Sequence, residues 1–284
     1  MDLLAKRVLY IDLSHATYAI KLDADLHRFI GGFGAGLKLL ATHQEEDPVV
    51  FSIGPLNGLF PFCSKTSIVC SDNGVIEDLY LGGSLSSRIR FAGVDSIVVH
   101  GRSKNPVILD IQDDTVLFSN AENTNPQSLG LPGKRSMFVY DTEKDKYVLD
   151  KYFNAPEKIL EKKLLEKNVY GVVVTGSTSI DISDYEKYEE LYKKILKLTD
   201  RLTVEKNNYP SCIGCPMGCQ WSKVGEIGGN VLPHSLVACN YAEKVFSDVS
   251  ITFSCLNFLG YDYTHEDIEN FPEMIKKLIE ELKQ

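Results

Sequence analysis

Short apolar runs fill the first half of the chain and predict β-strands. Residues 7–13 (RVLYIDL) alternate between apolar and polar side chains, and residues 16–22 (ATYAIKL) follow after a short polar link, as in a hairpin. A second hairpin is predicted where residues 106–111 and 115–118 flank Asp113 and Asp114. The remaining strand candidates, most of which end near a glycine, are residues 49–54, 66–70 and 96–101.

Helical periodicity becomes dominant near residue 183. Two short helices are expected earlier, at residues 25–29 and from Gly34 to Thr42. Ser183-Asp184 can cap a helix that begins with Glu186 in its first turn. Near the C-terminus one apolar stripe has helical spacing: Ile268, Phe271, Met274, Ile275, Leu278, Ile279 and Leu282. The pattern predicts an α+β protein, with a β-rich domain over residues 1–182 and a small helical segment over residues 183–284.

Composition narrows the classes of partner. The chain has 284 residues, of which 44% are hydrophobic and 24% charged, and its formal net charge is −9. No basic stripe is present to displace the counterions of a nucleic acid, so a nucleic-acid partner is not expected. No apolar run is long enough to span a bilayer, and the N-terminus lacks the apolar region of an export signal. Seven cysteines in such a chain predict a reducing, cytoplasmic location.

The strongest chemical signal is a group of three cysteines in one short loop. Cys212, Cys215 and Cys219 have C-x2-C-x3-C spacing, which brings three thiolates to positions where they can bind an iron–sulfur cluster. Gly214 and Gly218 give the backbone freedom to wrap around such a core. A cubane cluster needs a fourth ligand, for which the candidates in this chain are Cys239 and Cys255.

Two other interpretations of this loop remain open. Zinc commonly binds a C-x2-C pair together with a second pair of cysteine or histidine ligands, and His234 could join such a set. The cysteines could also be plain reduced thiols. A disulfide framework is disfavoured, because the chain is long and not dense in cysteine. We favour a [4Fe-4S] cluster.

Several phrases, taken in order, resemble the aldehyde ferredoxin oxidoreductase family of tungsten- or molybdenum-pterin enzymes. The cysteine loop resembles the family's cluster-binding C-x2-C-P-x-x-C in both spacing and proline, since Pro216 follows Cys215 directly. The N-terminal phrases that carry the resemblance are residues 8–14 (VLYIDLS), 29–37 (FIGGFGAGL), 53–58 (IGPLNG), 81–83 (LGG) and 88–101 (RIRFAGVDSIVVHG).

The resemblance implies a fold, cofactors and site residues. It implies an N-terminal domain of two packed sheets, a [4Fe-4S] cluster and a tungsten- or molybdopterin. Gly82 and Gly83 match a glycine pair that approaches the cofactor, and Lys65 stands where the family has a pterin-contacting arginine. Cys255 resembles a packed helix cysteine of the family, so Cys239 is the preferred fourth metal ligand. The implied activity is an oxidoreductase that converts aldehydes to acids, with electron transfer to ferredoxin.

The departures from the family define the alternatives. Family members are longer, and their C-terminal region supplies the fourth cluster cysteine, contacts to one pterin and the substrate channel. Their glycine-rich turn before the last strand of the domain is replaced here by residues 160–168 (LEKKLLEKN).

The first hypothesis is a short member or subunit that works with a second polypeptide, as an enzyme only with that partner chain. The second is a non-catalytic iron–sulfur electron-transfer or scaffold protein. The third is a degenerate relative that acts through protein contacts. A homo-oligomer is compatible with each of them.

Overall fold

Two six-stranded mixed sheets form the N-terminal part of the molecule. The computed structural model describes residues 4–154, 157–182, 184–223 and 230–282. The first sheet has the order β2-β1-β6-β3-β4-β5 and the second the order β11-β10-β9-β12-β7-β8. In each sheet one neighbouring pair is parallel, β1 with β6 and β12 with β7, and the other pairs are antiparallel. The expected α+β architecture with two sheets is therefore confirmed.

The strands are short, and most of them pair with the strand that precedes or follows them in the sequence. The first sheet contains β1 (Lys6–Asp12), β2 (Thr17–Asp23), β3 (Val49–Ser52), β4 (Thr66–Asp72), β5 (Val75–Leu81) and β6 (Ser96–His100). The second contains β7 (Val107–Gln112), β8 (Thr115–Asn120), β9 (Ser136–Asp141), β10 (Lys146–Leu149), β11 (Phe153–Asn154) and β12 (Val169–Thr175).

Among the described residues, three α-helices lie inside the two-sheet region and five follow it. The first three are α1 (Gly32–Thr42), α2 (Leu85–Phe91) and α3 (Lys158–Glu166). The later ones are α4 (Tyr185–Leu196), α5 (Val231–Ser235), α6 (Glu243–Phe246), α7 (Val249–Phe258) and α8 (His265–Leu282). Single 3-10 turns occur at His27–Phe29, Gln44–Glu46, Pro126–Ser128, Thr199–Arg201, Gln220–Lys223 and Asn240–Ala242. Among the described residues, no helix has the length and apolar character needed to cross a membrane.

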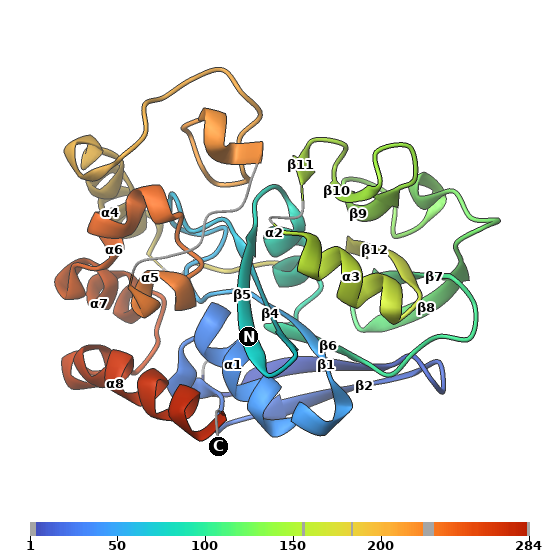
Figure 1. Cartoon of the computed structure of the whole chain (residues 1–284). Coiled ribbons are helices and arrows are strands. Elements are labelled where there is room, and N and C mark those ends of the chain that lie inside the picture. Colours follow the sequence, from blue (N-terminus) through green and yellow to red (C-terminus); the bar gives the residue numbers. More distant parts are fainter. Residues whose placement is uncertain (1–3, 155–156, 183, 224–229, 283–284) are drawn as a thin grey trace.

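Both faces of the central strands β3 and β6 of the first sheet are buried, and their alternating side chains belong to different apolar clusters. Val50 and Val98 pack with α1 and the C-terminal helices. Their neighbours Phe51 and Ile97 pack on the other face, with the second sheet, α2 and α3. Because successive side chains of a strand point to opposite faces, the continuous apolar run at β3 is what a doubly covered strand requires. Figure 1 shows the helices α4–α8 on one side and the strands β7–β12 on the other.

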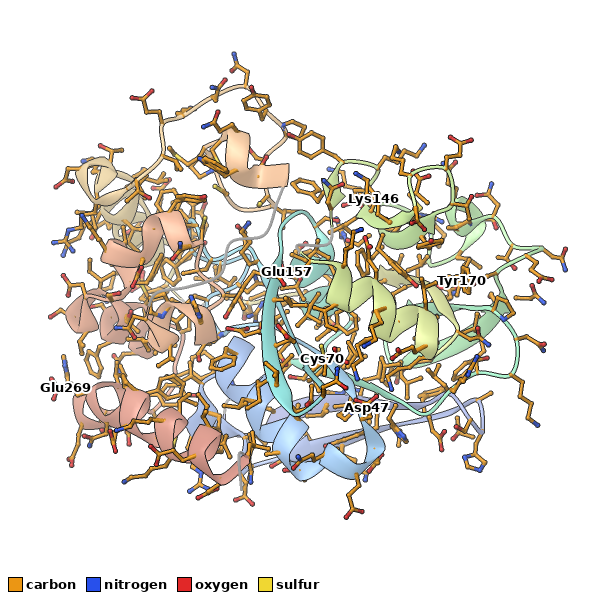
Figure 2. The ribbon with its side chains drawn as sticks, viewed as in Figure 1. Asp47, Cys70, Lys146, Glu157, Tyr170 and Glu269 are labelled. Carbon is orange, nitrogen blue, oxygen red and sulfur yellow. The ribbon has the colours of Figure 1, made fainter. Side chains whose placement is uncertain are left out.

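Two buried lysines, in α3 and just after it, pair with the half-exposed Asp47 and join α3 to the first sheet. Lys163 is nearly inaccessible, and its Nζ lies 3.0 Å from Oδ1 of Asp47, just before β3. The Nζ of Lys167 lies 3.7 Å from Oδ2 of the same aspartate. Figure 2 shows Asp47 and Cys70 in the layer between the first sheet and α3. The lysines of α3 thus hold the helix against the first sheet, where the sequence shows only an unpatterned charged run.

Most of the predicted strands and the two long helical stripes are confirmed. The hairpins are β1–β2 and β7–β8, and the stripe at the C-terminus is α8. The helix predicted after residue 183 is α4, whose N-cap Asp184 accepts a hydrogen bond from the backbone N–H of Lys187. The helix predicted at residues 25–29 was wrong, because only a 3-10 turn, His27–Phe29, forms there. Residue 183, where the predicted domain boundary falls, lies outside the described residues.

Candidate functional site

The cysteine loop is docked against the end of β5. The backbone N–H of Ile213 donates to the carbonyl oxygen of Gly83, at 3.0 Å. A Cβ at Gly82 would lie 2.8 Å from Sγ of Cys212, so only glycine lets the loop approach this closely. The N-terminal side of the loop is held by Asn207 and Tyr209, whose N–H groups donate to the carbonyls of Met217 and Gly218. The sulfur of Cys212 is therefore fixed beside Gly82.

A second segment brings Cys239 to the same region. Residues 237–239 run alongside residues 62–65, and the N–H of Cys239 donates to the carbonyl of Phe62 at 2.9 Å. Cys63 and Ala238 form an antiparallel bridge, and the N–H of Lys65 donates to the carbonyl of Val237. This pairing fixes the backbone of Lys65 and that of Cys239 relative to each other.

The ammonium group of Lys65 is the electrostatic centre of this arrangement. Lys65 is only 2% exposed, and its Nζ would be 3.4 Å from a Cβ at Gly82, on the side where Sγ of Cys212 also lies. Burial alone would lower the pKa of Lys65, but the thiolate forms of four cysteines would raise it above its ordinary value: Cys212, Cys239, Cys219 and Cys215. A buried cation thus stands within electrostatic reach of all four predicted ligands.

The four cysteines lie at the meeting point of the two apolar clusters. Cys212 belongs to the cluster between the sheets, Cys219 belongs to the cluster under the helices, and Cys215 packs against both. Burial raises the pKa of Cys239 and raises that of Cys215 to about 12, so both are neutral thiols unless a metal or a cation compensates the charge. All seven cysteines of the chain are free. No group of three or more cysteine, histidine, aspartate or glutamate side chains in the described ranges is arranged to hold a metal ion.

The other predicted residues have different surroundings. Gly83 has a φ of +93°, and a Cβ there would lie 2.7 Å from Leu149 and 2.8 Å from Phe153. His234, the alternative zinc ligand, has its Nδ1 3.4 Å from Oδ2 of Asp78 and its ring 4.9 Å from that of Tyr80. Cys255 is fully buried in the cluster under the helices. The structure therefore places Lys65 and Cys212 beside Gly82 and pairs the segment of Lys65 with that of Cys239, whereas His234 contacts Asp78 and Tyr80.

The fold thus has two mixed six-stranded sheets, with the cysteine loop packed against the glycine pair Gly82 and Gly83. Residues 8–145 match the sequence profile described as aldehyde ferredoxin oxidoreductase, N-terminal domain. The match covers just under half of the chain, so it shows similarity to that family over the N-terminal domain.

Curated relatives match only part of their own length. One is the "aliphatic sulfonate oxidoreductase, WOR-like subunit" of Pyrococcus furiosus, 33% identical over 40% of this chain and 21% of the relative. Another is the "tungsten-containing aldehyde ferredoxin oxidoreductase" of Pyrococcus horikoshii, 22% identical over 68% of this chain and 37% of the relative. The chain thus spans between about a fifth and two fifths of the relatives that it matches.

A solved structure shares the fold over nearly the whole chain. It is described as the active site complex BamBC of benzoyl coenzyme A reductase in complex with 1,5 dienoyl-CoA. The similarity has a TM-score of 0.64 at 15% identity and covers 98% of this chain and 60% of the other. At this identity the match shows the fold alone, and it includes the helical segment that the family profile does not cover.

Proposed function

We propose that the chain is a short member or subunit of an aldehyde ferredoxin oxidoreductase-like enzyme that holds a [4Fe-4S] cluster through Cys212, Cys215, Cys219 and Cys239. The observation that carries the proposal is the position of the buried Lys65 ammonium, next to Gly82 as Sγ of Cys212 is, on a segment that pairs with residues 237–239. Thiolates that bind a cluster are anionic, and a buried anionic group requires a compensating charge. Lys65 supplies that charge at a place from which water is largely excluded, since its side chain is buried.

We infer that a cluster suits these four cysteines better than a single metal ion, since no three ligand side chains in the described ranges converge on one point. Each cysteine of a cubane binds a different iron, so its four sulfurs surround the core instead of meeting at one ion. Here the loop approaches from the second sheet's side and Cys239 from the helical segment. When bound, the cluster supplies one-electron transfer. The protein's part is to hold the ligands, exclude water with the apolar side chains on both sides, and set the potential with Lys65.

The residues predicted to bind a pterin do not fit that group. Lys65 faces the cysteines, and the Cα of Gly83 faces Leu149 and Phe153. Where the family has a glycine turn, this chain forms α3, whose lysines Lys163 and Lys167 pair with Asp47. We therefore assign no chemistry of a tungsten- or molybdenum-pterin to the residues of this chain. Oxidation of an aldehyde, with ferredoxin as acceptor, would need a second polypeptide that supplies the metal–pterin.

The same misfit supports a second candidate function. A chain that keeps the four cysteines without a pterin cradle is suited to electron transfer or to a scaffold role in a larger complex. A degenerate relative that acts only through protein contacts would need neither the cysteines nor Lys65 in this arrangement. Iron content separates that last alternative from the first two.

Chemical analysis of anaerobically purified protein tests the proposal. We expect a brown protein with about four iron and four sulfide per chain, without tungsten, molybdenum or aldehyde-dependent dye reduction in the isolated chain. Activity that appears only when a second polypeptide co-purifies would favour the enzyme subunit over the electron-transfer protein. A colourless protein with stoichiometric zinc would refute the cluster.

Replacing Lys65 by methionine should lower the reduction potential of the reconstituted cluster. Removing one charge several Å away, in a medium of effective dielectric about 20, changes the energy by roughly 2–3 kcal/mol, on the order of 100 mV for one electron. The sign is negative, because the cation favours the reduced, more anionic state. Redox titration monitored by electron paramagnetic resonance measures the shift.

Lys65→Arg is the matched control for that shift, because it keeps the charge and changes only the shape of the head group. A potential that is the same in the methionine variant and the natural protein would show that the ammonium does not act on the cluster.

A further inference from the structure

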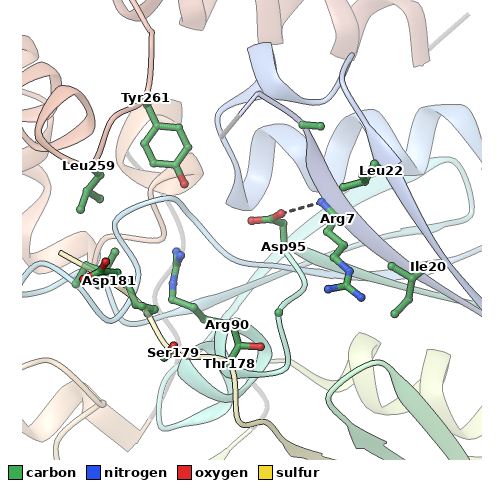
Figure 3. A pocket seen from close by; sticks show the side chains of 14 residues that line it. Arg7, Ile20, Leu22, Arg90, Asp95, Thr178, Ser179, Asp181, Leu259 and Tyr261 are labelled. Carbon is green, nitrogen blue, oxygen red and sulfur yellow. Dashed lines mark hydrogen bonds between the residues drawn. The ribbon is translucent and has the colours of Figure 1, made fainter. Parts of the chain in front are cut away.

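A large cavity lies at the end of α2 that is remote from the cysteine loop. Its volume is about 740 Å³, which is within the range of small-molecule sites. The glycine pair that contacts Cys212 precedes α2, whereas Gly93, which lines the cavity, follows it. Figure 3 shows side chains that surround the cavity: they come from β1, β2, α2, the segment between α2 and β6, residues 178–181 and the segment after α7.

Two nearly buried polar side chains in this cavity have unused hydrogen-bonding capacity. Tyr261 is 4% exposed, and its ring is fixed by Tyr263, 5.8 Å away, and by Nζ of Lys6, 5.0 Å from the ring centroid. Its hydroxyl has no hydrogen-bond partner among the residues that the structure describes. Asp95 is 8% exposed, and within the described residues its carboxylate accepts one hydrogen bond, from the backbone N–H of Arg7 at 2.8 Å. In Figure 3 this hydroxyl and this carboxylate face the same space.

The guanidinium of Arg7 adds a cation at the wall next to β2. Within the described ranges it makes no ion pair and no side-chain hydrogen bond. The absence of a side chain at Gly93 keeps the space beside it open, since a Cβ there would lie 3.5 Å from Nη1 of Arg7. A second cation, Arg90, is already engaged, because its Nη2 donates to the carbonyls of Gly54 and Pro55. Arg7 is therefore the cation that can meet a ligand.

The lining as a whole is apolar and balanced in charge. Ile20, Leu22 and Leu259 contribute aliphatic wall, while Arg7 and Arg90 are matched by Asp95 and Asp181. A ligand that brings only a carboxylate would leave the buried Asp95 unpaired, and one that brings only an ammonium would do the same to Arg7. A ligand with both charges and an apolar body pairs with Asp95, pairs with Arg7 and covers the aliphatic wall.

We propose that this cavity binds a zwitterionic ligand with an apolar body, of the size of a short apolar peptide. Its ammonium pairs with Asp95 and its carboxylate with the Arg7 guanidinium, while the Tyr261 hydroxyl hydrogen-bonds a polar atom between them. A free amino acid is small for a space of about 740 Å³, whereas two or three apolar residues fill it better. The site is independent of the cluster, since none of the residues that bind the ligand contacts the cysteines.

Calorimetry of the full chain with L-leucyl-L-leucine tests the proposal directly. Two blocked probes separate the charges: N-acetyl-leucyl-leucine lacks the ammonium, and leucyl-leucine amide lacks the carboxylate. We expect saturable binding of the free dipeptide and at least about tenfold weaker binding of each blocked probe. No binding of the free dipeptide at about 10 mM would overturn the proposal, and so would equal binding of all three probes.

Variants assign each charge to its residue. Asp95→Asn keeps an oxygen that can accept from the Arg7 N–H, so the fold is retained, and it should weaken the free dipeptide about tenfold while leaving the N-acetyl probe unchanged. Arg7→Gln should do the converse, leaving the amide probe unchanged. Tyr261→Phe should weaken binding about fivefold, whereas the exposed Tyr209→Phe should not. Uniform loss across all probes in both charge variants, or no loss in either, would contradict the assignment.

Discussion

Alanine at Cys215 is expected to abolish the cluster. Cys215 lies between the other two loop cysteines in the sequence and packs against both apolar clusters, so it is the central ligand of the proposed set. Loss of one of four ligands leaves an iron exposed to solvent and chelators, and the remaining core becomes labile. Iron should fall from about four to below about one per chain, with loss of the brown colour. Iron and sulfide assays with visible absorption spectra measure the effect.

Cys70→Ala is the matched control for that loss. Cys70 is fully buried in β4, and burial raises the pKa of its thiol to about 12, so it behaves as a small apolar side chain. Its removal leaves a small cavity that costs about 1 kcal/mol of folding stability. The iron content of this variant should remain that of the natural protein. Equal iron in the Cys215 and Cys70 variants would mean that the loop does not hold the cluster.

Strands with a clear apolar pattern could be predicted from the sequence, and strands stabilised by distant partners could not. β3 and β6 read as continuous apolar runs because both faces of their sheet are covered. β5 reads as VIEDLYL, in which Glu77 and Asp78 interrupt the pattern. Asp78 is tolerated because it faces His234, more than a hundred residues further along the chain. That contact forms only in the folded chain, so no local sequence pattern predicts it.

The candidate sites show the same division. The sequence predicts the loop cysteines from their spacing, since three ligands of one cluster lie close together in sequence. The direction of Lys65 depends on the pairing of residues 62–65 with 237–239, which no local pattern predicts. Arg7, Asp95 and Tyr261 come from segments with no shared motif and no helical or strand periodicity that links them. Only the packing of β1 against the segment after α7 brings them to one cavity.

A second large effect is expected at Gly176, in the segment that leads from β12 to α4. This residue follows β12 and passes directly over the end of α2, where the N–H of Thr178 donates to the carbonyl of Phe91. A Cβ at Gly176 would lie 2.1 Å from the backbone nitrogen of Ala92 and 2.1 Å from the carbonyl carbon of Phe91. Both are main-chain atoms, so relief requires separating β12 from α2. We expect Gly176→Ala to lower the free energy of unfolding by about 3 kcal/mol or more.

Gly171→Ala in the same strand is the matched comparison. A Cβ there would lie 2.9 Å from Cγ1 of Val139, which is the end of a side chain and can move. Its cost should be about 1 kcal/mol, at the low end of overpacking effects. Urea denaturation of both variants, with equal slopes and different midpoints, measures the difference. Equal losses at the two glycines would show that close passage of the chain over α2 does not limit stability. A large loss at Gly176 alone would show that stability depends on the close packing of the chain against α2. One end of this helix meets the cysteine loop, and its other end lines the cavity.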